Sequence, residues 1–338
     1  MARRVVAAVG ARPLCAEGQA MKAAIVTRFG PRWSIEVAET PKPVPAAGEI
    51  LVRVRAATVN RSDCGELLHP LFQRLITRQP RRTILGMDFA GEVEAIGASV
   101  ARFKPGDRVF GMSAWGRSGA QAEYVCLPDT APIAAIPANV SFDEAPVFEG
   151  AYYASGTVAA FGLRPGHKIL IYGASGAIGT AAVQLANYAG AEVTAVVAAR
   201  HIALAGSLGA HRVIDYATAE FRQLGNAFDF VLDAVGKMSV GEWRRLLKPN
   251  GRFAVTDLGP WGQDAPFLLW SAITRNGKVS VPLPQRGSAQ SFADFLGARM
   301  EAGEFRAAID RKYPLDGIAD AYRYVLTGQK AGIVAIDV

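Results

Sequence analysis

The sequence has few residues that bind zinc or form disulfides. Its 338 residues include three cysteines, Cys15, Cys64 and Cys126, which form no Cys-x-x-Cys pair. Such a set builds neither a disulfide framework nor a four-thiolate zinc site. The four histidines show no paired spacing, and we expect surface or turn roles for them: His69, His167, His201 and His211. The scarcity of cysteine favours a reducing compartment, and we expect the protein in the cytoplasm.

Long apolar segments and basic runs are also missing. The longest apolar candidate, residues 169–198, is interrupted by Gln184, Asn187 and Glu192, whereas a membrane helix needs roughly 18 consecutive apolar residues. The net charge is +7, yet no five consecutive residues are Lys or Arg. This distribution argues against a membrane or nucleic-acid partner and suits a small polyanionic ligand such as a phosphorylated cofactor.

The first twenty residues differ in composition from the rest. They are rich in Arg, and their apolar run ends at Arg12-Pro13, too early for a secretory signal. A strand-like pattern then starts at Met21. We expect residues 1–20 to be an extension outside the fold, explained by a start codon placed too early or by a mitochondrial-type targeting segment.

The rest of the chain has two kinds of sequence pattern. Residues 49–59 and 89–97 alternate apolar and polar side chains, and a Pro-Gly-Asp turn at 105–107 precedes another strand, which predicts a compact β-barrel. Beyond Glu144, strands and helices alternate. The strand candidates are residues 168–172, 192–197, 212–216, 228–233, 252–256 and 278–282. The expected fold class is α/β, with a doubly wound parallel sheet in the second part.

A glycine-rich turn comes directly after the first strand of that sheet. In KILIYGASGAIGTAAVQLA, Gly176 and Gly179 hold the last two places of the pattern G-x-G-x-x-G, Ala174 replaces the first glycine, and Gly173 precedes it. Gly176 lets the backbone approach a pyrophosphate, and Gly179 lets the helix pack on its strand. The free N–H groups at the helix start face the phosphates. The predicted dinucleotide site also includes the intervening residues Ser175, Ala177 and Ile178.

The second strand ends without an acidic residue. An NAD site would place Asp or Glu there to hold the ribose 2′-hydroxyl, but the chain has Ala198, Ala199 and Arg200. The guanidinium of Arg200 suits a 2′-phosphate, so we expect NADPH. Tyr216, at the end of the next strand, could hydrogen-bond the same phosphate. A solvated cation and ordinary packing are the alternative roles of these two residues.

Three stretches carry a family resemblance: GMDFAGEVEAIGASVARFKPGDRVFG, EGAYYASGTVAAFGLRPGHKILIYGASGAIGTAAVQLANYAGAEVTAV and SLGAHRVIDY. They resemble the zinc-independent, quinone-oxidoreductase-like branch of the medium-chain dehydrogenase/reductase superfamily. The resemblance implies a GroES-like β-barrel domain (residues 21–143 and 285–338), a Rossmann domain (144–284) and an active site in the cleft between them. It also implies NADPH-dependent reduction of quinones or enones, commonly by homodimers, and a tyrosine at position 216.

Zinc-containing relatives have ligands at three places where this chain has none. The matching positions hold Asn60 in NRSDCG, Met87 in GMDFAG and, aligned less surely, Phe148 in VFEGAY. None of the three is a useful zinc ligand, so we expect no metal. Without a Lewis acid nothing stabilises the alkoxide of a saturated alcohol, and reduction of an already polarised double bond is the easier chemistry.

The candidate catalytic side chains are Asn60 and Tyr152. The amide of Asn60 could hydrogen-bond the nicotinamide or the substrate oxygen, with a turn residue as the alternative. Tyr152, or its neighbour Tyr153, could donate a proton or cover the nicotinamide, with aromatic core packing as the alternative. Asp63 is interpreted as a helix N-cap, because Glu66 stands at the N3 position of a capping box.

The sequence therefore predicts an NADPH-dependent oxidoreductase that delivers hydride to a small-molecule acceptor, a quinone, an enone or a related activated carbonyl. Two alternatives stay open: a zinc-free NADP-dependent alcohol or aldehyde dehydrogenase, and a non-catalytic NADPH-binding protein.

Overall fold

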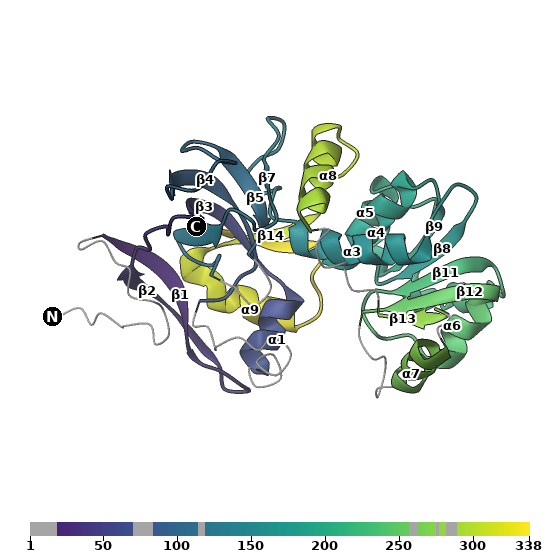
Figure 1. The fold of residues 1–338 in the computed structure, drawn as a ribbon. Coiled ribbons are helices and arrows are strands. Elements are labelled where there is room, and N and C mark those ends of the chain that lie inside the picture. Colours follow the sequence, from purple (N-terminus) through teal and green to yellow (C-terminus); the bar gives the residue numbers. More distant parts are fainter. Residues whose placement is uncertain (1–18, 70–83, 114–118, 257–262, 275–276, 282–288) are drawn as a thin grey trace. The chain divides into compact units, whose positions relative to one another are not determined.

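The computed structural model describes residues 19–69, 84–113, 119–256, 263–274, 277–281 and 289–338 (Figure 1). By their contacts these residues form two compact units. The first runs to Glu149 and includes 290–302 and 309–338, and the second comprises 150–289 and 303–308. The predicted domain boundaries at 143/144 and 284/285 stay a proposal, and residues 303–308, which they assign to the first domain, group by contacts with the second unit. Residues 1–18 of the expected extension lie outside the described part, whereas Ala20 already pairs with Pro41.

The first unit is built on a seven-stranded sheet with the order β14-β15-β3-β4-β5-β7, in which β6 also pairs with β3, and on a separate β1-β2 hairpin. Its strands are β1 (Ala20–Arg28), β2 (Ser34–Pro41), β3 (Glu49–Val59), β4 (Asp88–Ile96), β5 (Arg108–Met112), β6 (Tyr124–Pro128), β7 (Ile133–Ala135), β14 (Ile309–Pro314) and β15 (Ile333–Asp337). The alternation predicted for residues 49–59 holds only from Val52 to Arg55, where Val52 and Val54 are buried and Arg53 is exposed, because Leu51 is buried beside Ile50.

The last residues of the chain complete this unit. Strand β15 pairs antiparallel with β3, and helix α9 (Ile318–Leu326) buries Ile318, Tyr322 and Val325 on one face. The hydroxyl of Tyr322 donates to Gln121 Oε1 at 2.9 Å, and Gln121 Nε2 donates to the carbonyl of Thr58 at 3.0 Å. The unit also contains α1 (Arg61–Leu68) and α8 (Ala289–Glu301). The amino-terminal stretch and the tail therefore share one core.

The second unit confirms the predicted doubly wound parallel sheet. Its six strands have the order β10-β9-β8-β11-β12-β13 and are parallel throughout. They are β8 (Lys168–Tyr172), β9 (Glu192–Val197), β10 (Arg212–Asp215), β11 (Phe228–Asp233), β12 (Leu247–Val255) and β13 (Val279–Ser280). The helices of this part are α3 (Phe148–Phe161), α4 (Ala177–Tyr188), α5 (Ile202–Ser207), α6 (Val240–Leu246) and α7 (Ala265–Thr274).

The strand order reverses between β8 and β11. Strand β8 leads by one crossover to β9 on one side, and β11 pairs with its other side. In open α/β sheets, ligands bind beyond the carboxyl ends of the strands at such a reversal. The glycine-rich turn comes directly after β8, so the fold places it where a dinucleotide binds.

Candidate functional site

The turn after β8 requires glycine at its first position. Gly173 has a φ of +75°, which residues with a Cβ rarely adopt. A Cβ there would also lie 2.6 Å from Cγ1 of Val235. The turn is fixed by hydrogen bonds from Gly173 N–H to the carbonyl of Val196 at 3.0 Å and from Gly176 N–H to the carbonyl of Gly173 at 3.1 Å.

The two later glycines have different constraints. A Cβ on Gly179 would lie 2.2 Å from the carbonyl oxygen of Gly173, whereas a Cβ on Gly176 would meet nothing closer than that same oxygen at 3.7 Å. Gly179 is therefore needed for helix–strand packing, and Gly176 leaves open space beside the turn. Gly176 is the N-cap of α4 and has no side chain to cap it.

Amide groups at the start of α4 are available to an anion. The first hydrogen bond along the helix runs from Thr180 N–H to the carbonyl of Gly176 at 2.8 Å, so the N–H groups of Ala177, Ile178 and Gly179 precede it. The partly buried Ser175 lies in the turn itself. Together with the positive end of the helix dipole, this arrangement fits the pyrophosphate of a dinucleotide.

A second loop, after β11, lies against the glycine turn and was missed by the sequence interpretation. The fully buried carboxylate of Asp233 accepts hydrogen bonds from the N–H groups of Val235 at 3.0 Å and Met238 at 2.6 Å. Burial raises the pKa of Asp233, and these amide donors oppose the rise. In the sequence, this loop could have been recognised only from Asp233 and Val235, which stand two residues apart at the end of an apolar strand.

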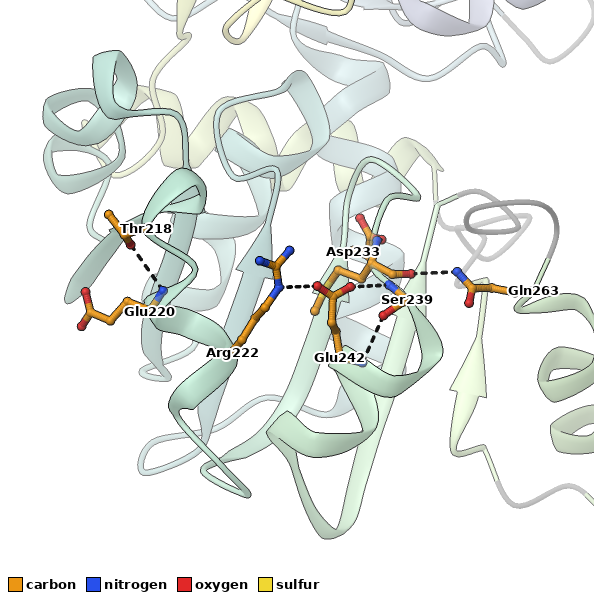
Figure 2. Close-up of polar contacts among 8 residues, drawn as sticks. Thr218, Glu220, Arg222, Asp233, Ser239, Glu242 and Gln263 are labelled. Atoms are coloured by element: carbon orange, nitrogen blue, oxygen red, sulfur yellow. Dashed lines mark hydrogen bonds and ion pairs between the residues drawn. The ribbon is translucent and has the colours of Figure 1, made fainter.

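The far side of this loop is held by a polar network that Figure 2 shows. Ser239 and Glu242 form a capping box at the start of α6, with Ser239 N–H donating to Glu242 Oε2 at 2.7 Å. Arg222 donates to the other oxygen of Glu242. Gln263 Nε2 donates to the carbonyl of Met238 at 3.4 Å. The loop from Asp233 to Ser239 is thus fixed at both ends.

Arg200 and Tyr216 come after neighbouring strands at the same edge of the sheet. Asp215 pairs with Val197, so the residues after β9 and β10 come close to each other. Arg200 is exposed and its Nε donates to His201 Nε2 at 3.1 Å, and Tyr216 is 50% exposed in a short 3-10 helix. The predicted strand 212–216 is therefore one residue too long, and neither side chain is part of the core.

The structure corrects the assignment of the helix cap in the first unit. The N-cap of α1 is Asn60, and Asp63 is its N3 residue, whose Oδ2 accepts the Asn60 backbone N–H at 2.7 Å. The prediction of Asp63 as N-cap was wrong because the helix begins at Arg61. Both hydrogens of the Asn60 amide are used, by Thr58 Oγ1 at 3.0 Å and Asp88 Oδ2 at 3.1 Å.

These two hydrogen bonds leave only the Oδ1 atom of the Asn60 amide to interact with a ligand. Its Oδ1 is buried and faces the Asp63 backbone N–H in the capping box without a hydrogen bond of full geometry to any described residue, and the residue as a whole is 6% exposed. An Asn in this state offers an acceptor to a ligand, and it donates only by giving up an existing hydrogen bond.

Three buried carboxyl groups surround Asn60. Asp63 and Asp88 have pKa values raised well above their ordinary range, chiefly by burial and next by the charge of Glu149. Burial likewise raises the pKa of Glu149. Lys330 lies close to this group, and burial lowers its pKa to about 8 although nearby carboxylates oppose that shift. Such perturbed groups gather at functional sites.

Tyr152 lies in α3 and is 3% exposed, so the structure agrees with a packed aromatic ring at this position. Tyr153 is partly buried. Tyr152 belongs to the second unit, and Asn60 belongs to the first.

The residues that the family resemblance sets at zinc-ligand positions, Asn60, Met87 and less surely Phe148, are poor zinc ligands. Phe148 is fully buried and packs edge-on against Phe292 with ring centres 5.6 Å apart. Met87 is a thioether, and Asn60 turns its amide nitrogen toward Asp88. Within the described ranges, no three His, Cys, Asp or Glu side chains are placed to hold a metal ion. In those same ranges, no helix is long and apolar enough to span a membrane.

Comparison with known proteins agrees with this geometry. The alcohol dehydrogenase GroES-like domain model matches residues 46–138, and the zinc-binding dehydrogenase model matches 208–336. A quinone-oxidoreductase homolog of spinach (Spinacia oleracea) chloroplasts is 30% identical over 312 residues, covering 88% of this chain and 92% of the relative. A trans-enoyl reductase of Aspergillus terreus is 31% identical over 317 residues, with 86% of each chain covered. The solved quinone oxidoreductase of Coxiella burnetii has a TM-score of 0.81 at 24% identity, covering 95% of this chain and 100% of that one.

The fold and site define an oxidoreductase with a GroES-like domain and a Rossmann-type sheet that takes a nicotinamide dinucleotide. More closely, the chain belongs to the quinone-oxidoreductase-like branch of the medium-chain dehydrogenase/reductase superfamily.

Proposed function

We propose that this protein is an NADPH-dependent reductase of quinones, enones or related activated carbonyls, and that it works without zinc. The observation that carries the proposal is a complete dinucleotide turn in a chain that has Asn60, Met87 and, aligned less surely, Phe148 where the family resemblance sets zinc ligands. When bound, the dinucleotide supplies a hydride. With no Lewis acid to stabilise an alkoxide, the double bond of the acceptor must already be polarised by conjugation with a carbonyl group.

The residues of the second unit bind and orient the dinucleotide. The glycine turn and the N–H groups of Ala177 to Gly179 hold the pyrophosphate, and the loop after Asp233 limits its position beside Gly173. Arg200 and Tyr216 select the 2′-phosphate, because a carboxylate that would repel it is missing after β9. Correct orientation of the hydride donor supplies a large part of the rate.

Asn60 and Tyr152 act on the reacting groups in this proposal. Asn60 presents its free Oδ1, which suits the N–H of the nicotinamide carboxamide better than a substrate oxygen. Tyr152 offers a hydroxyl that can donate to an acceptor oxygen. The names of the spinach and Aspergillus terreus relatives, a quinone-oxidoreductase homolog and a trans-enoyl reductase, support acceptors of this class.

An acceptor screen tests the proposal. Purified protein with NADPH is offered quinones and enones while the cofactor absorbance is monitored, and in parallel NADP⁺ is offered saturated alcohols. We expect NADPH consumption with conjugated acceptors only. Alcohol-dependent reduction of NADP⁺ would instead identify a zinc-free dehydrogenase, an alternative favoured by the alcohol dehydrogenase model that matches residues 46–138. Cofactor binding with no turnover of any acceptor would identify a non-catalytic protein.

We further propose that the protein works in the cytoplasm and forms homodimers. The scarcity of cysteine supports the first point. The second point is supported by the family resemblance, which implies homodimers. Sedimentation of the purified protein at several concentrations tests it.

A further inference from the structure

This inference rests on the proposed function and concerns the proton that the reduction consumes. The first unit buries three carboxyl groups around Asn60: Asp63 is 2% exposed, Asp88 0% and Glu149 5%. They are linked through short contacts. Asn60 Nδ2 donates to Asp88 Oδ2 at 3.1 Å, and the backbone N–H of Glu149 donates to Asp88 Oδ1 at 2.8 Å. We call Asp63, Asp88 and Glu149 the carboxyl cluster.

The described residues place more carboxyl groups than cations in this cluster. Among the described residues, Lys330 is a cation that interacts with the charges of Glu149 and Asp63, and its Nζ donates to the carbonyl of Gly332 at 2.6 Å. If all three carboxyl groups were ionised, one ammonium would leave two buried negative charges uncompensated. Isolated buried charges are so costly that such groups change their protonation state instead.

A metal ion is not placed to supply the missing charge. Both oxygens of Asp88 already accept N–H groups, and Asp63 Oδ2 accepts the backbone N–H of Asn60 at 2.7 Å. A carboxylate whose oxygens already accept N–H groups does not turn those oxygens toward a cation. No metal-binding group of three such side chains occurs in the described ranges. Among the described residues, protons are therefore the counter-charge that the geometry leaves for the cluster.

Unsatisfied polar atoms mark one side of the cluster. Glu149 Oε2, Ser62 Oγ and Asn60 Oδ1 are all buried and make no hydrogen bond of full geometry to a described residue, although Ser62 and Asn60 lie beside Glu149. Ser62 and Asn60 both lie near enough to Glu149 to favour its ionised form. Orphaned buried polar atoms are rare in native proteins and call for a ligand or a water molecule. A hydroxyl such as that of Ser62 both accepts and donates a proton.

We propose that the carboxyl cluster holds the proton that the reduction consumes, and that Glu149 and Ser62 pass it along the side of Asn60 toward the acceptor. The reduction adds one hydride and one proton to a conjugated acceptor. The hydride forms a new C–H bond, and the π electrons move onto the acceptor oxygen. One carboxyl O–H bond then breaks, its proton bonds to the resulting enolate oxygen, and the carboxylate regains a proton from solvent water.

Several other groups face the cluster and share its titration. The charge of Glu66 acts on Asp63, and that of Arg61 acts on Cys64. Tyr322 lies within the charge field of Asp63, Cys64 and Glu66. Lys330 also faces Asp310. These neighbours are acids, weak acids, one lysine and one arginine. Because they interact with one another, the protons belong to the cluster as a whole and not to a single residue.

The first test detects the stored proton without cofactor or substrate. A protonated carboxylic acid has an infrared carbonyl band that is distinct from that of a carboxylate and shifts in D₂O. We expect such a band in the free enzyme at neutral pH, and a smaller band in Glu149→Gln, Asp88→Asn or Asp63→Asn. Asp316→Asn, which changes a carboxylate that is 71% exposed, serves as the control and should leave the band unchanged. A spectrum with no such band, or one that all three cluster variants leave unaltered, overturns the proposal.

The second test links the proton to turnover. Loss of a proton donor typically slows an enzyme about 10²- to 10⁴-fold, so Glu149→Gln should lower kcat by about a hundredfold or more with little change in the NADPH KM. Glu149→Asp, which keeps a carboxyl group, should recover part of the loss, and a melting curve establishes that each variant folds. If Asp88→Asn does not fold, Glu149→Gln and Glu149→Asp suffice.

The outcomes separate this proposal from the proposed function. Reduction of acceptors by wild-type protein without an infrared band, or with full activity in Glu149→Gln, contradicts the proton store alone. An infrared band in a protein that reduces no acceptor contradicts the proposed function, and the proton-supply role fails with it.

Discussion

At the scale of single residues, the cofactor choice depends on the side chains just beyond β9. Arg200 is exposed shortly after β9, Tyr216 follows the neighbouring strand β10, and the residues directly after β9 include no carboxylate that would repel a 2′-phosphate. A guanidinium offers two parallel donors to a phosphate, and a lysine offers a point charge. The preference for NADPH should therefore depend on the shape of the Arg200 side chain as well as on its charge.

NADPH should bind more tightly than NADH, and Arg200→Ala should remove most of the difference. Charge-assisted hydrogen bonds of about 1.5 to 3 kcal/mol correspond to roughly a 10- to 150-fold preference. Titration of both cofactors by fluorescence measures it. Arg200→Lys, as the matched variant, should keep part of the preference. Equal affinities of the wild-type protein for the two cofactors would rule out this role of Arg200.

Asn60→Ala should weaken the binding of NADPH more than it slows the chemical step. Both amide hydrogens of Asn60 are used within the protein, so under the proposed function its Oδ1 is the atom left to accept a hydrogen bond from the cofactor, with a typical value of about 0.5 to 1.5 kcal/mol. The NADPH KM should rise a few-fold. Thr58→Val, which removes one partner of the same amide and leaves Asn60 in place, is the control. A fall in kcat of about a hundredfold at constant KM would show instead that Asn60 donates to a developing oxyanion.

At the scale of elements, the turn between β8 and α4 separates the two uses of glycine. Gly176 has an ordinary φ of −74° and open space beside it, whereas Gly179 is pressed against the carbonyl of Gly173. The first glycine leaves room for the ligand, and the second leaves room for the protein itself.

Gly176→Ala should fold normally and bind the dinucleotide poorly, because its Cβ fills the space through which the pyrophosphate approaches. Gly179→Ala should lower the free energy of unfolding by about 1 to 3 kcal/mol, the usual cost of overpacking. Urea unfolding and cofactor titration of both variants measure the two effects. Equal stability losses in the pair would contradict the distinction between the two glycines.

Much of the fold could be predicted at this scale because the signals are local. Strands β8, β9 and β11 have the predicted bounds, since short apolar runs and flanking glycines lie together in the sequence. The start of α1 was misplaced by the choice between two nearby capping residues, Asn60 and Asp63. The carboxyl cluster escaped prediction because Asp63, Asp88 and Glu149 lie far apart along the chain and only the fold brings them together.

At the scale of the whole molecule, the buried carboxyl groups should make stability depend on pH. Their pKa values are raised in the folded protein, so the stability that they contribute is present below the pKa of the unfolded chain. It is lost as the pH rises through the folded values. The free energy of unfolding should therefore fall from mildly acidic toward neutral pH.

Urea unfolding across that range measures this dependence, and Glu149→Gln should flatten it. The comparison of wild type with variant cancels the titration of groups elsewhere in the chain. A wild-type curve that rises toward neutral pH in step with that of Glu149→Gln would mean that the cluster is ionised without penalty.

The central claim is that this chain moves hydride from NADPH to a conjugated acceptor without a metal. It is tested most directly by NADPH oxidation with a quinone or enone after exhaustive chelation and elemental analysis. The replacement of zinc ligands by Asn60, Met87 and Phe148 predicts full activity, no stoichiometric zinc and no reduction of NADP⁺ by the corresponding saturated alcohol. One zinc per chain, or activity that chelation abolishes and added zinc restores, would contradict the claim.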